Sequence, residues 1–482
     1  MHLGLQPIGF IVGIFITTLA VVMAVPALAD LVTGNRDWLT FAVSSGGGLV
    51  FGGLLILSSY RERIALSVHQ AFLLTTSAWI AASAYGALPF YFSELDLSYA
   101  DAYFEAISGL TTTGSTILSG LDSMPPGILL WRSILHWVGG IGIIVMAVAI
   151  LPYLRVGGMQ LFRTESSDRS EKVLPGAAQI AAAITRVYAL LTALCILAYW
   201  SCGMTAFEAV NHAMATLSTG GYSTSDASLG HFEQPAIHWF ATLFMLAGGL
   251  PFVLYVQAIN RMDWAPLWDS QVRVFIAFLA IVVGVLSTWL SLTQQLDFLV
   301  ALRLVAFNVV SIVTTTGFAT TDYTTWGAPA QMAFFLLTYI GGCTGSTAGG
   351  IKIFRFQVMG AATGMQFRRL VHPHAVYIAR YNGRPLPEDV MTSVANFVLM
   401  FLVSAVFLSV ALGCLGLDFV TAVSGAATAL ANVGPGLGGT IGPAGNFASL
   451  PDAAKWLLSA GMLLGRLEIL TCLILLTPAF WR

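Results

Sequence analysis

Long apolar runs separated by short polar breaks dominate the hydrophobic pattern of the chain. Ten of these runs are long enough to cross about 30 Å of hydrocarbon as helices. They lie at residues 3–28, 38–58, 67–91, 127–153, 180–203, 236–259, 272–293, 329–364, 389–415 and 453–479. The run at 329–364 is too long and too rich in glycine to form one straight helix. The pattern predicts an all-α integral membrane protein that crosses the bilayer many times.

Composition supports the same class. Of the 482 residues, 57% are hydrophobic and 9% are charged, whereas about 25% are charged in an ordinary soluble domain. A net charge of −2 gives no indication of nucleic-acid binding. The sequence contains no Walker motif, serine triad or zinc-ligand spacing, so we expect neither an enzyme nor an organic cofactor.

The positions of the cations predict the orientation, because Lys and Arg are enriched in cytoplasmic loops. With a cytoplasmic N-terminus, 16 of the 21 Lys and Arg residues fall on cytoplasmic segments. The exceptions are Arg36, Arg132, Arg303, Lys455 and Arg466. The opposite face collects carboxylates such as Asp226 and Asp322, which either concentrate cations in an outer vestibule or are simply solvated loop residues.

One structural unit recurs four times. Four polar segments align on a glycine: LTTTGST at Gly114, LSTGGYS at Gly221, VTTTGFA at Gly317 and ANVGPG at Gly434. Each follows an apolar stretch too short to span the bilayer and precedes a long apolar helix, which carries a second glycine mark at Gly140, Gly249, Gly342 or Gly465. We therefore expect a leading two-helix domain at 1–64 and four repeats at 65–165, 166–262, 263–384 and 385–482.

Each expected half-helix must line a wet cavity, because backbone that is not hydrogen-bonded costs several kcal/mol in lipid. Four half-helices on the outer side would direct their partially negative C-termini at one axis. Glycine permits positive φ where a loop turns, Thr and Ser hydroxyls hold such a loop from behind, and rings of main-chain carbonyls select potassium. We expect two leading helices and four pseudo-symmetric helix–pore helix–filter loop–helix repeats around one central pore.

These residues resemble the Trk/Ktr/HKT superfamily of cation transporters, and in particular its bacterial Trk-type potassium uptake branch. The resemblance covers nearly the whole chain and includes three further segments: ILPYLRVGGMQLFRTE at 150–165, GGCTGSTAGGIKIFR at 341–355 and GRLEILTCLILLTPAFWR at 465–482. It implies K⁺ uptake across the bacterial inner membrane, a cytoplasmic regulatory subunit of the NAD- or ATP-binding type, and a homodimer surrounded by membrane lipid.

The resemblance also implies a filter made by the four glycine segments. Its residues are Thr112, Thr113, Gly114, Thr219, Gly220, Gly221, Thr315, Thr316, Gly317, Asn432, Val433 and Gly434. Glycine at every central position is the family pattern associated with potassium, whereas a serine in the first loop marks sodium-preferring relatives. Asn432 and Val433 depart from the Thr-Thr-Gly pattern, so we expect a filter without exact fourfold symmetry and with modest selectivity.

The glycines of GGCTGSTAGG predict unwound backbone, because glycine costs about 1 kcal/mol per helical position relative to alanine. The resemblance implies an intramembrane gate that includes Gly345, Ser346, Thr347, Gly349, Gly350 and Lys352. The alternative is a close-packed helix interface, since Gly341, Gly345 and Gly349 have the four-residue spacing of such interfaces.

Arg466 is an arginine well inside an expected span, where charges are costly and face a cavity or a partner. The resemblance places it beside the ion path, where a positive charge slows cations. The alternative is a structural pair with a pore-facing carbonyl, Glu105 or Glu208, because Glu468 lies on another helical face.

A second transport mechanism stays open from the sequence. In a sodium- or proton-coupled symporter with alternating access, the same broken helices would form a substrate site at the bilayer midplane. Placement of all four loops on one side favours a pore. A purely structural scaffold does not explain the recurrence of the glycine loops.

Overall fold

Helices make up nearly all regular structure in the computed structural model, which describes residues 5–60, 67–149 and 177–482. The expected all-α class is confirmed. Three predictions from the sequence concern residues outside the described part of the chain. The first two are the family segment at 150–165 and the boundaries after residues 64 and 165. The third is the cytoplasmic placement of the cations Arg61, Arg63, Arg155, Arg163, Arg169 and Lys172.

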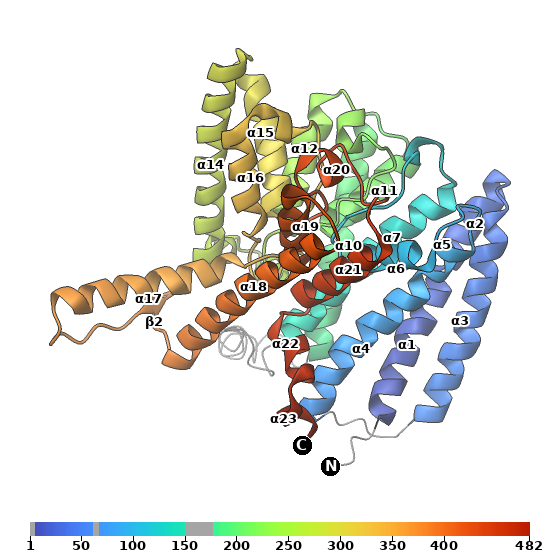
Figure 1. Ribbon diagram of the computed structural model, residues 1–482, viewed down its shortest axis with the longest axis horizontal. Helices are drawn as coiled ribbons and strands as arrows, with labels where there is room; N and C mark the ends of the chain where they lie inside the picture. Colours follow the sequence, from blue (N-terminus) through green and yellow to red (C-terminus); the bar gives the residue numbers. More distant parts are fainter. Residues whose placement is uncertain (1–4, 61–66, 150–176) are drawn as a thin grey trace.

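A long antiparallel pair forms the N-terminal part of the chain. α1 and α2 follow one another with a single residue between them, and α3 runs back alongside both. Figure 1 shows α1, α2 and α3 on one flank, remote from α14 and α15. The bounds are α1 Gln6–Val22, α2 Ala24–Thr33 and α3 Asp37–Ser59.

Four groups of helices follow, and each contains a short helix that precedes a glycine segment. The first group has α4 Val68–Gly86, α5 Leu88–Phe92, α6 Tyr99–Leu110, η1 Leu121–Ser123 and α7 Pro126–Ala149. The second has α10 Ala177–Ser201, α11 Ala206–Leu217, η2 Ser228–His231, α12 Pro235–Gly248, α13 Phe252–Arg261 and η3 Ala265–Trp268.

The third group contains the longest excursion from the helical body. α17 projects outward and leads through a two-stranded hairpin to α18 (Figure 1). Its elements are α14 Ser270–Gln294, α15 Phe298–Val313, η4 Tyr323–Trp326, α16 Ala328–Thr338, α17 Ile353–Val371, β1 Arg380–Tyr381 and β2 Arg384–Pro385. The fourth group has α18 Glu388–Cys414, α19 Phe419–Ala431, α20 Gly438–Ile441, α21 Asp452–Arg466, α22 Leu470–Leu473, η5 Ile474–Leu476 and α23 Pro478–Trp481.

The expected half-helices are confirmed as α6, α11, α15 and α19. Each begins with a side-chain N-cap, from Ser98, Thr205, Asp297 or Asp418, that accepts a backbone N–H of the first turn. Their C-terminal halves are buried on every side, in contrast to α14 and α18, which expose apolar side chains along their length. The half-helices therefore lie inside the protein, where their ends are shielded from lipid.

Three of the ten expected spans are sharply bent or interrupted by irregular backbone in the described chain. Seven helices of the described chain are long and apolar enough to cross a bilayer. The run at 236–259 bends by 91° between α12 and α13, and the run at 453–479 bends by 108° between α21 and α22. The run at 329–364 is divided into α16, an irregular segment and α17, which confirms that it is not one straight helix.

Candidate functional site

The four glycine segments follow the half-helices with the same backbone geometry. We name them loops 1 to 4, for residues 112–114, 219–221, 315–317 and 432–434. In each loop the second residue donates its N–H to a carbonyl five positions earlier. These bonds are Thr113 N to Ser108 O (2.9 Å), Gly220 N to Ala215 O (2.8 Å), Thr316 N to Ser311 O (2.8 Å) and Val433 N to Thr428 O (3.0 Å). Four Schellman-type helix ends therefore lead the chain out of the half-helices in the same way.

The first residue of every loop adopts a left-handed conformation. The φ angles are +52° at Thr112, +52° at Thr219, +59° at Thr315 and +56° at Asn432. A β-branched residue at such φ is strained by about 1–2 kcal/mol, whereas asparagine tolerates it. Asn432 thus fits the same backbone shape in the loop that lacks the threonine pair. The sequence predicts positive φ at the glycines and gives no signal for it at the residue that starts each loop.

The central glycines bring the loops together in a ring. Gly114, Gly221 and Gly317 have φ of +85°, +84° and +83°. A Cβ atom on Gly114 would overlap the carbonyl oxygen of Gly220, and one on Gly221 would overlap that of Thr316. A Cβ on Gly317 would lie 2.9 Å from Gly434 N, and one on Gly434 would lie 3.0 Å from Gly114 O. The contacts run from loop 1 through loops 2, 3 and 4 back to loop 1.

Gly434 differs from the other three central glycines, since its φ is not positive. Ser115 Oγ donates to the Gly434 carbonyl at 2.9 Å, and Asn432 Nδ2 donates to Thr113 Oγ1 at 3.0 Å. These contacts join loop 4 to loop 1. The ring closes, and it does so without exact fourfold symmetry.

A cavity of about 250 Å³ opens on one side of this ring. Its lining includes Gly114, Gly221, Gly317 and Gly434, one glycine from each loop. None of the twelve loop residues carries a carboxylate. Asp226 also lines the cavity, but its carboxylate accepts the N–H of Gly120 at 2.9 Å.

Glycines at or next to the expected marks allow the following helices to approach the half-helices closely. Gly139 and Gly248 directly precede the marks Gly140 and Gly249, and Gly465 is itself a mark. A Cβ on Gly139 would overlap Leu110 O, and one on Gly465 would overlap Leu430 O. One on Gly248 would lie 3.1 Å from Leu217 O. These carbonyls belong to the final turns of α6, α11 and α19, so the glycines let long helices pack directly beside the helix ends.

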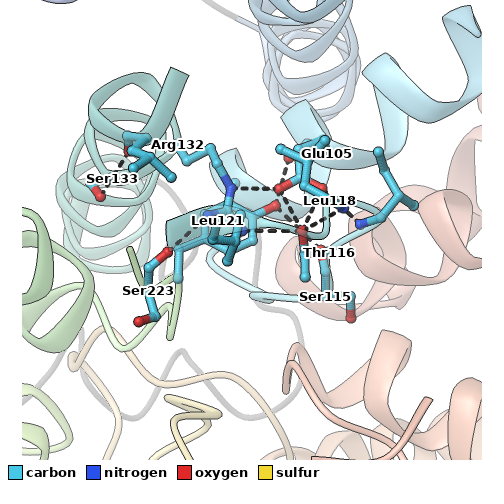
Figure 2. A network of polar contacts seen from close by, with 12 residues as sticks. Glu105, Ser115, Thr116, Leu118, Leu121, Arg132, Ser133 and Ser223 are labelled. Carbon is cyan, nitrogen blue, oxygen red and sulfur yellow. Dashed lines mark hydrogen bonds and ion pairs between the residues drawn. The ribbon is translucent and has the colours of Figure 1, made fainter. Parts of the chain in front are cut away.

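A buried ion pair lies behind loops 1 and 2, as Figure 2 shows. Arg132 Nε on α7 contacts Glu105 Oε1 on α6 at 2.7 Å, and both side chains are fully buried. Glu105 also accepts from Thr116 Oγ1 and Ile117 N at 3.0 Å. Arg132 Nη1 donates to Ser223 O at 2.9 Å, just beyond loop 2. One ion pair thus holds the residues that follow loop 1 and the residues that follow loop 2.

Aromatic stacking extends this ion pair. The Arg132 guanidinium lies 4.0 Å from the Tyr222 ring centroid, and the His136 ring stacks on the same Tyr222 ring with a centroid distance of 4.0 Å. His136 Nδ1 contacts Gly109 O at 2.7 Å. His212 and His238 also contact backbone carbonyls, and all three histidines are buried.

The glycine-rich segment 339–352 is unwound, as its composition predicts. Gly345 and Gly350 have φ of +79° and +64°, and a short parallel bridge joins Ile340 to Ile351. The alternative of a packed helix interface through Gly341, Gly345 and Gly349 is wrong, because no helix forms there.

This segment lies directly against the loops. Gly349 N donates to Thr315 Oγ1 of loop 3 at 2.7 Å. Thr347 Oγ1 contacts Leu217 O at 3.1 Å and Gly248 O at 2.9 Å. A small cavity of about 30 Å³ is lined by Gly345, Ser346, Gly349, Gly350, Lys352 and Arg466, among others. The structure therefore brings all the expected gate residues except Thr347 to one cavity, and Thr347 contacts Arg466 beside it.

Arg466 is buried at the end of α21 and points at this segment. Its Nη1 donates to Thr347 O at 2.8 Å. The proposed pairing with Glu105 or Glu208 is wrong, because Glu105 binds Arg132 and Glu208 caps α11. The pairing with a carbonyl is confirmed. Glu468 contacts Arg355 Nη2 at 2.5 Å instead. It is not a partner of Arg466, as expected, but the reason differs: α21 ends at Arg466, and Glu468 has φ of +61° in the bend that follows.

Comparison with known proteins identifies the family. The cation transport protein family TrkH matches residues 47–481. The chain belongs to this family. It is 49% identical to the Trk system potassium uptake protein TrkI of Halomonas elongata, over 99% of this chain and 97% of that protein.

Two further relatives extend the match. Identity is 38% to the Trk system potassium uptake protein TrkH of Escherichia coli K12, over 98% of each chain. The crystal structure of the potassium transporter TrkH from Vibrio parahaemolyticus has 35% identity and a TM-score of 0.92, with 100% of both chains covered. The chain therefore has the fold of this transporter family as well as its sequence.

Proposed function

We propose that this chain takes up potassium across the bacterial cytoplasmic membrane through a channel-like pore, with loops 1 to 4 as the filter. The closed ring of loops carries the proposal. Its main-chain oxygens come from backbone held in place by four Schellman-type ends and by contact between neighbouring glycines. Such a ring replaces the hydration shell of a monovalent cation. The names of the relatives supply potassium as the cargo.

Electrostatics favour a cation at the ring. The C-termini of α6, α11, α15 and α19 all end at it, and each terminus carries a partial negative charge. The loops contain no carboxylate. Carboxylates would suit a divalent ion better than potassium. An ion gradient or the membrane potential drives the flux.

The segment 339–352 is the proposed gate. It lies against loop 3 and is held by Arg466, so its displacement would open the path. Lys352 Nζ contacts Ala348 O within the segment, which places a second cation beside Arg466 in the same small cavity. Both charges would oppose the passage of K⁺ in the closed form.

Regulation is proposed to come from a cytoplasmic NAD- or ATP-binding subunit, and the pore chain is proposed to form a homodimer with a cytoplasmic N-terminus. The projecting α17 and its hairpin support a docking surface, since they carry exposed arginines (Figure 1). These are Arg368, Arg369, Arg380 and Arg384.

Ion flux in liposomes tests the proposal. We expect K⁺ to move down its gradient without added Na⁺ or a pH gradient, at a higher rate than Na⁺. Dependence on a sodium or proton gradient, with saturation at low K⁺, would instead support the coupled symporter. Equal flux of K⁺, Na⁺ and choline would overturn the filter.

A further inference from the structure

The stretch from the start of α13 to the first turn of α14 is bonded to the gate segment at both of its ends. We name residues 252–271, which include α13 and η3, the linker segment. At its start, Phe252 N donates to Gly345 O at 3.0 Å. At its end, the buried side chain of Gln271 accepts Thr344 N through Oε1 at 3.0 Å. Thr344 and Gly345 are neighbours, so any movement of the linker segment acts on a single point of the gate segment.

The middle of the linker segment exposes large apolar side chains. Trp264 is 67% exposed, Trp268 is 72% exposed and Met262 is 90% exposed. Each free indole in water would leave a large apolar area unburied. Tryptophan is enriched at membrane–water interfaces, where its ring enters the lipid and its N–H meets the headgroups.

The neighbouring surface indicates what covers these indoles. α14 starts two residues after Trp268, and its exposed side chains include Val274, Ile276 and Ile281. This apolar surface faces hydrocarbon in a spanning helix, and the indoles lie at its end. α13 bends by 91° from α12, buries Phe252, Val256 and Ala258 against the protein and exposes Arg261, so its axis runs across the direction of α12.

Charge around the indoles is balanced. Arg261 and Arg273 are offset by Asp263 and Asp269, and both carboxylates already accept backbone N–H groups. Asp269 also accepts Asn382 Nδ2 at 3.0 Å, which places this end of α14 beside the β1–β2 hairpin. Balanced charge favours the headgroup layer of any phospholipid over a specific acidic lipid.

We propose that the linker segment anchors in the lipid headgroup layer through Trp264 and Trp268, and that it couples the position of this layer to the gate segment. The inference rests on the proposed function, since it takes 339–352 as the gate. A thicker or thinner bilayer moves the headgroup layer relative to the pore, and the two bonds to Thr344 and Gly345 carry that movement to the gate.

Fluorescence quenching tests the lipid contact without reference to transport. Wild-type protein and the Trp264→Phe/Trp268→Phe variant are reconstituted in phosphatidylcholine vesicles, with either brominated acyl chains or aqueous iodide as quencher. The emission lost in the variant should be the part that brominated lipid quenches. Quenching of that part by iodide alone would mean that the indoles face water or a soluble partner, and would overturn the proposal.

Flux in vesicles of different thickness tests the coupling. Potassium flux of the wild type should change by about threefold or more between short and long acyl chains, because mismatch costs fractions of a kcal/mol per Å. Trp264→Ala/Trp268→Ala should flatten this dependence. Trp200→Ala is the matched control, since Trp200 is 60% exposed on α10 and its helix makes no bond to the gate segment in the described chain.

The outcomes separate the two proposals. Selective flux that is independent of thickness, or a double variant that keeps the wild-type dependence, overturns the coupling and leaves the filter intact. Absence of selective flux in every vesicle overturns the proposed function and with it the coupling. In that case quenching by brominated lipid still supports the headgroup anchor.

Discussion

Arg466 Nη1 donates a hydrogen bond to the carbonyl oxygen of Thr347 at 2.8 Å, and this bond joins the end of α21 to the gate segment. Its Nε and Nη2 have no hydrogen-bond partner among the described residues, although Nη1 does. The guanidinium is therefore held by one bond while the rest of its charge faces the small cavity beneath the loops.

Arg466→Ala should raise potassium current. It removes a positive charge from the path and a charge-assisted bond of about 1.5–3 kcal/mol from the closed gate, which corresponds to roughly tenfold or more in the opening equilibrium. Flux per reconstituted molecule measures this. Lys455→Ala serves as a control on the same helix, because Lys455 pairs with Asp101 and makes no bond to the gate. Unchanged or lower current in Arg466→Ala would contradict the barrier role.

Gly114→Ala should abolish selective uptake. The new Cβ would overlap Gly220 O in the neighbouring loop at a residue whose φ is +85°, so loops 1 and 2 must separate. Gly34→Ala is the matched control, since Gly34 has φ of +75° with open space around its Cβ position. It should cost only the backbone strain of about 1–2 kcal/mol. Normal K⁺ selectivity in Gly114→Ala would argue against the ring as the filter.

Thr347→Val should raise leak flux in the absence of any regulator. It removes the hydroxyl whose single proton is shared between Leu217 O and Gly248 O, at a cost of about 1 kcal/mol, or roughly fivefold in leak. Thr347→Ser keeps the hydroxyl and should behave as the wild type. Deletion of 344–349 should produce a larger leak. If Thr347→Val, Thr347→Ser and the deletion all leak at the wild-type rate, the segment does not act as a gate.

The half-helices and their caps are predictable from the sequence because local rules determine them. Short apolar stretches start after Ser98, Thr205, Asp297 and Asp418 and end at a glycine loop. The unwound segment 339–352 is predictable for the same reason, since five of the ten residues at 341–350 are glycine and disfavour a helix. Each glycine segment alone is a weak signal, and the fold is predictable because the same unit recurs four times.

Long-range pairs were not predictable in this way. The sequence contains no signal that Arg132 selects Glu105, or that Arg355 selects Glu468, because each partner lies far away in the sequence. Glu105 is on α6, and Glu468 is in the bend after α21. The bends near Pro251 and Glu468 are likewise accompanied by long-range contacts, from Phe252 N to Gly345 O and from Glu468 to Arg355. Residue preferences do not predict the positive φ of Thr112, Thr219 and Thr315, because threonine disfavours this conformation and contacts around the ring impose it.

Arg132→Lys should lower K⁺ over Na⁺ selectivity while flux persists. The guanidinium reaches Glu105, Thr116 and Ser223 O at once, and a lysine ammonium cannot span these three acceptors. Loops 1 and 2 then lose their common support, and a loss of about 1.4 kcal/mol in discrimination would reduce the selectivity ratio about tenfold. Flux ratios in liposomes measure the effect.

Asp101→Asn provides the matched control for this last change. It weakens a second ion pair, in which the buried Lys455 Nζ contacts the half-buried Asp101 Oδ1 at 2.5 Å and joins α21 to α6. Asp101 hydrogen-bonds to none of the four loops in the described structure. Because each change weakens an ion pair of α6, thermal stability should fall in both variants. Only Arg132→Lys should change selectivity, because only its ion pair lies behind the ring. Equal loss of selectivity in both would mean that general loosening of α6, and not support of loops 1 and 2, sets the ion preference.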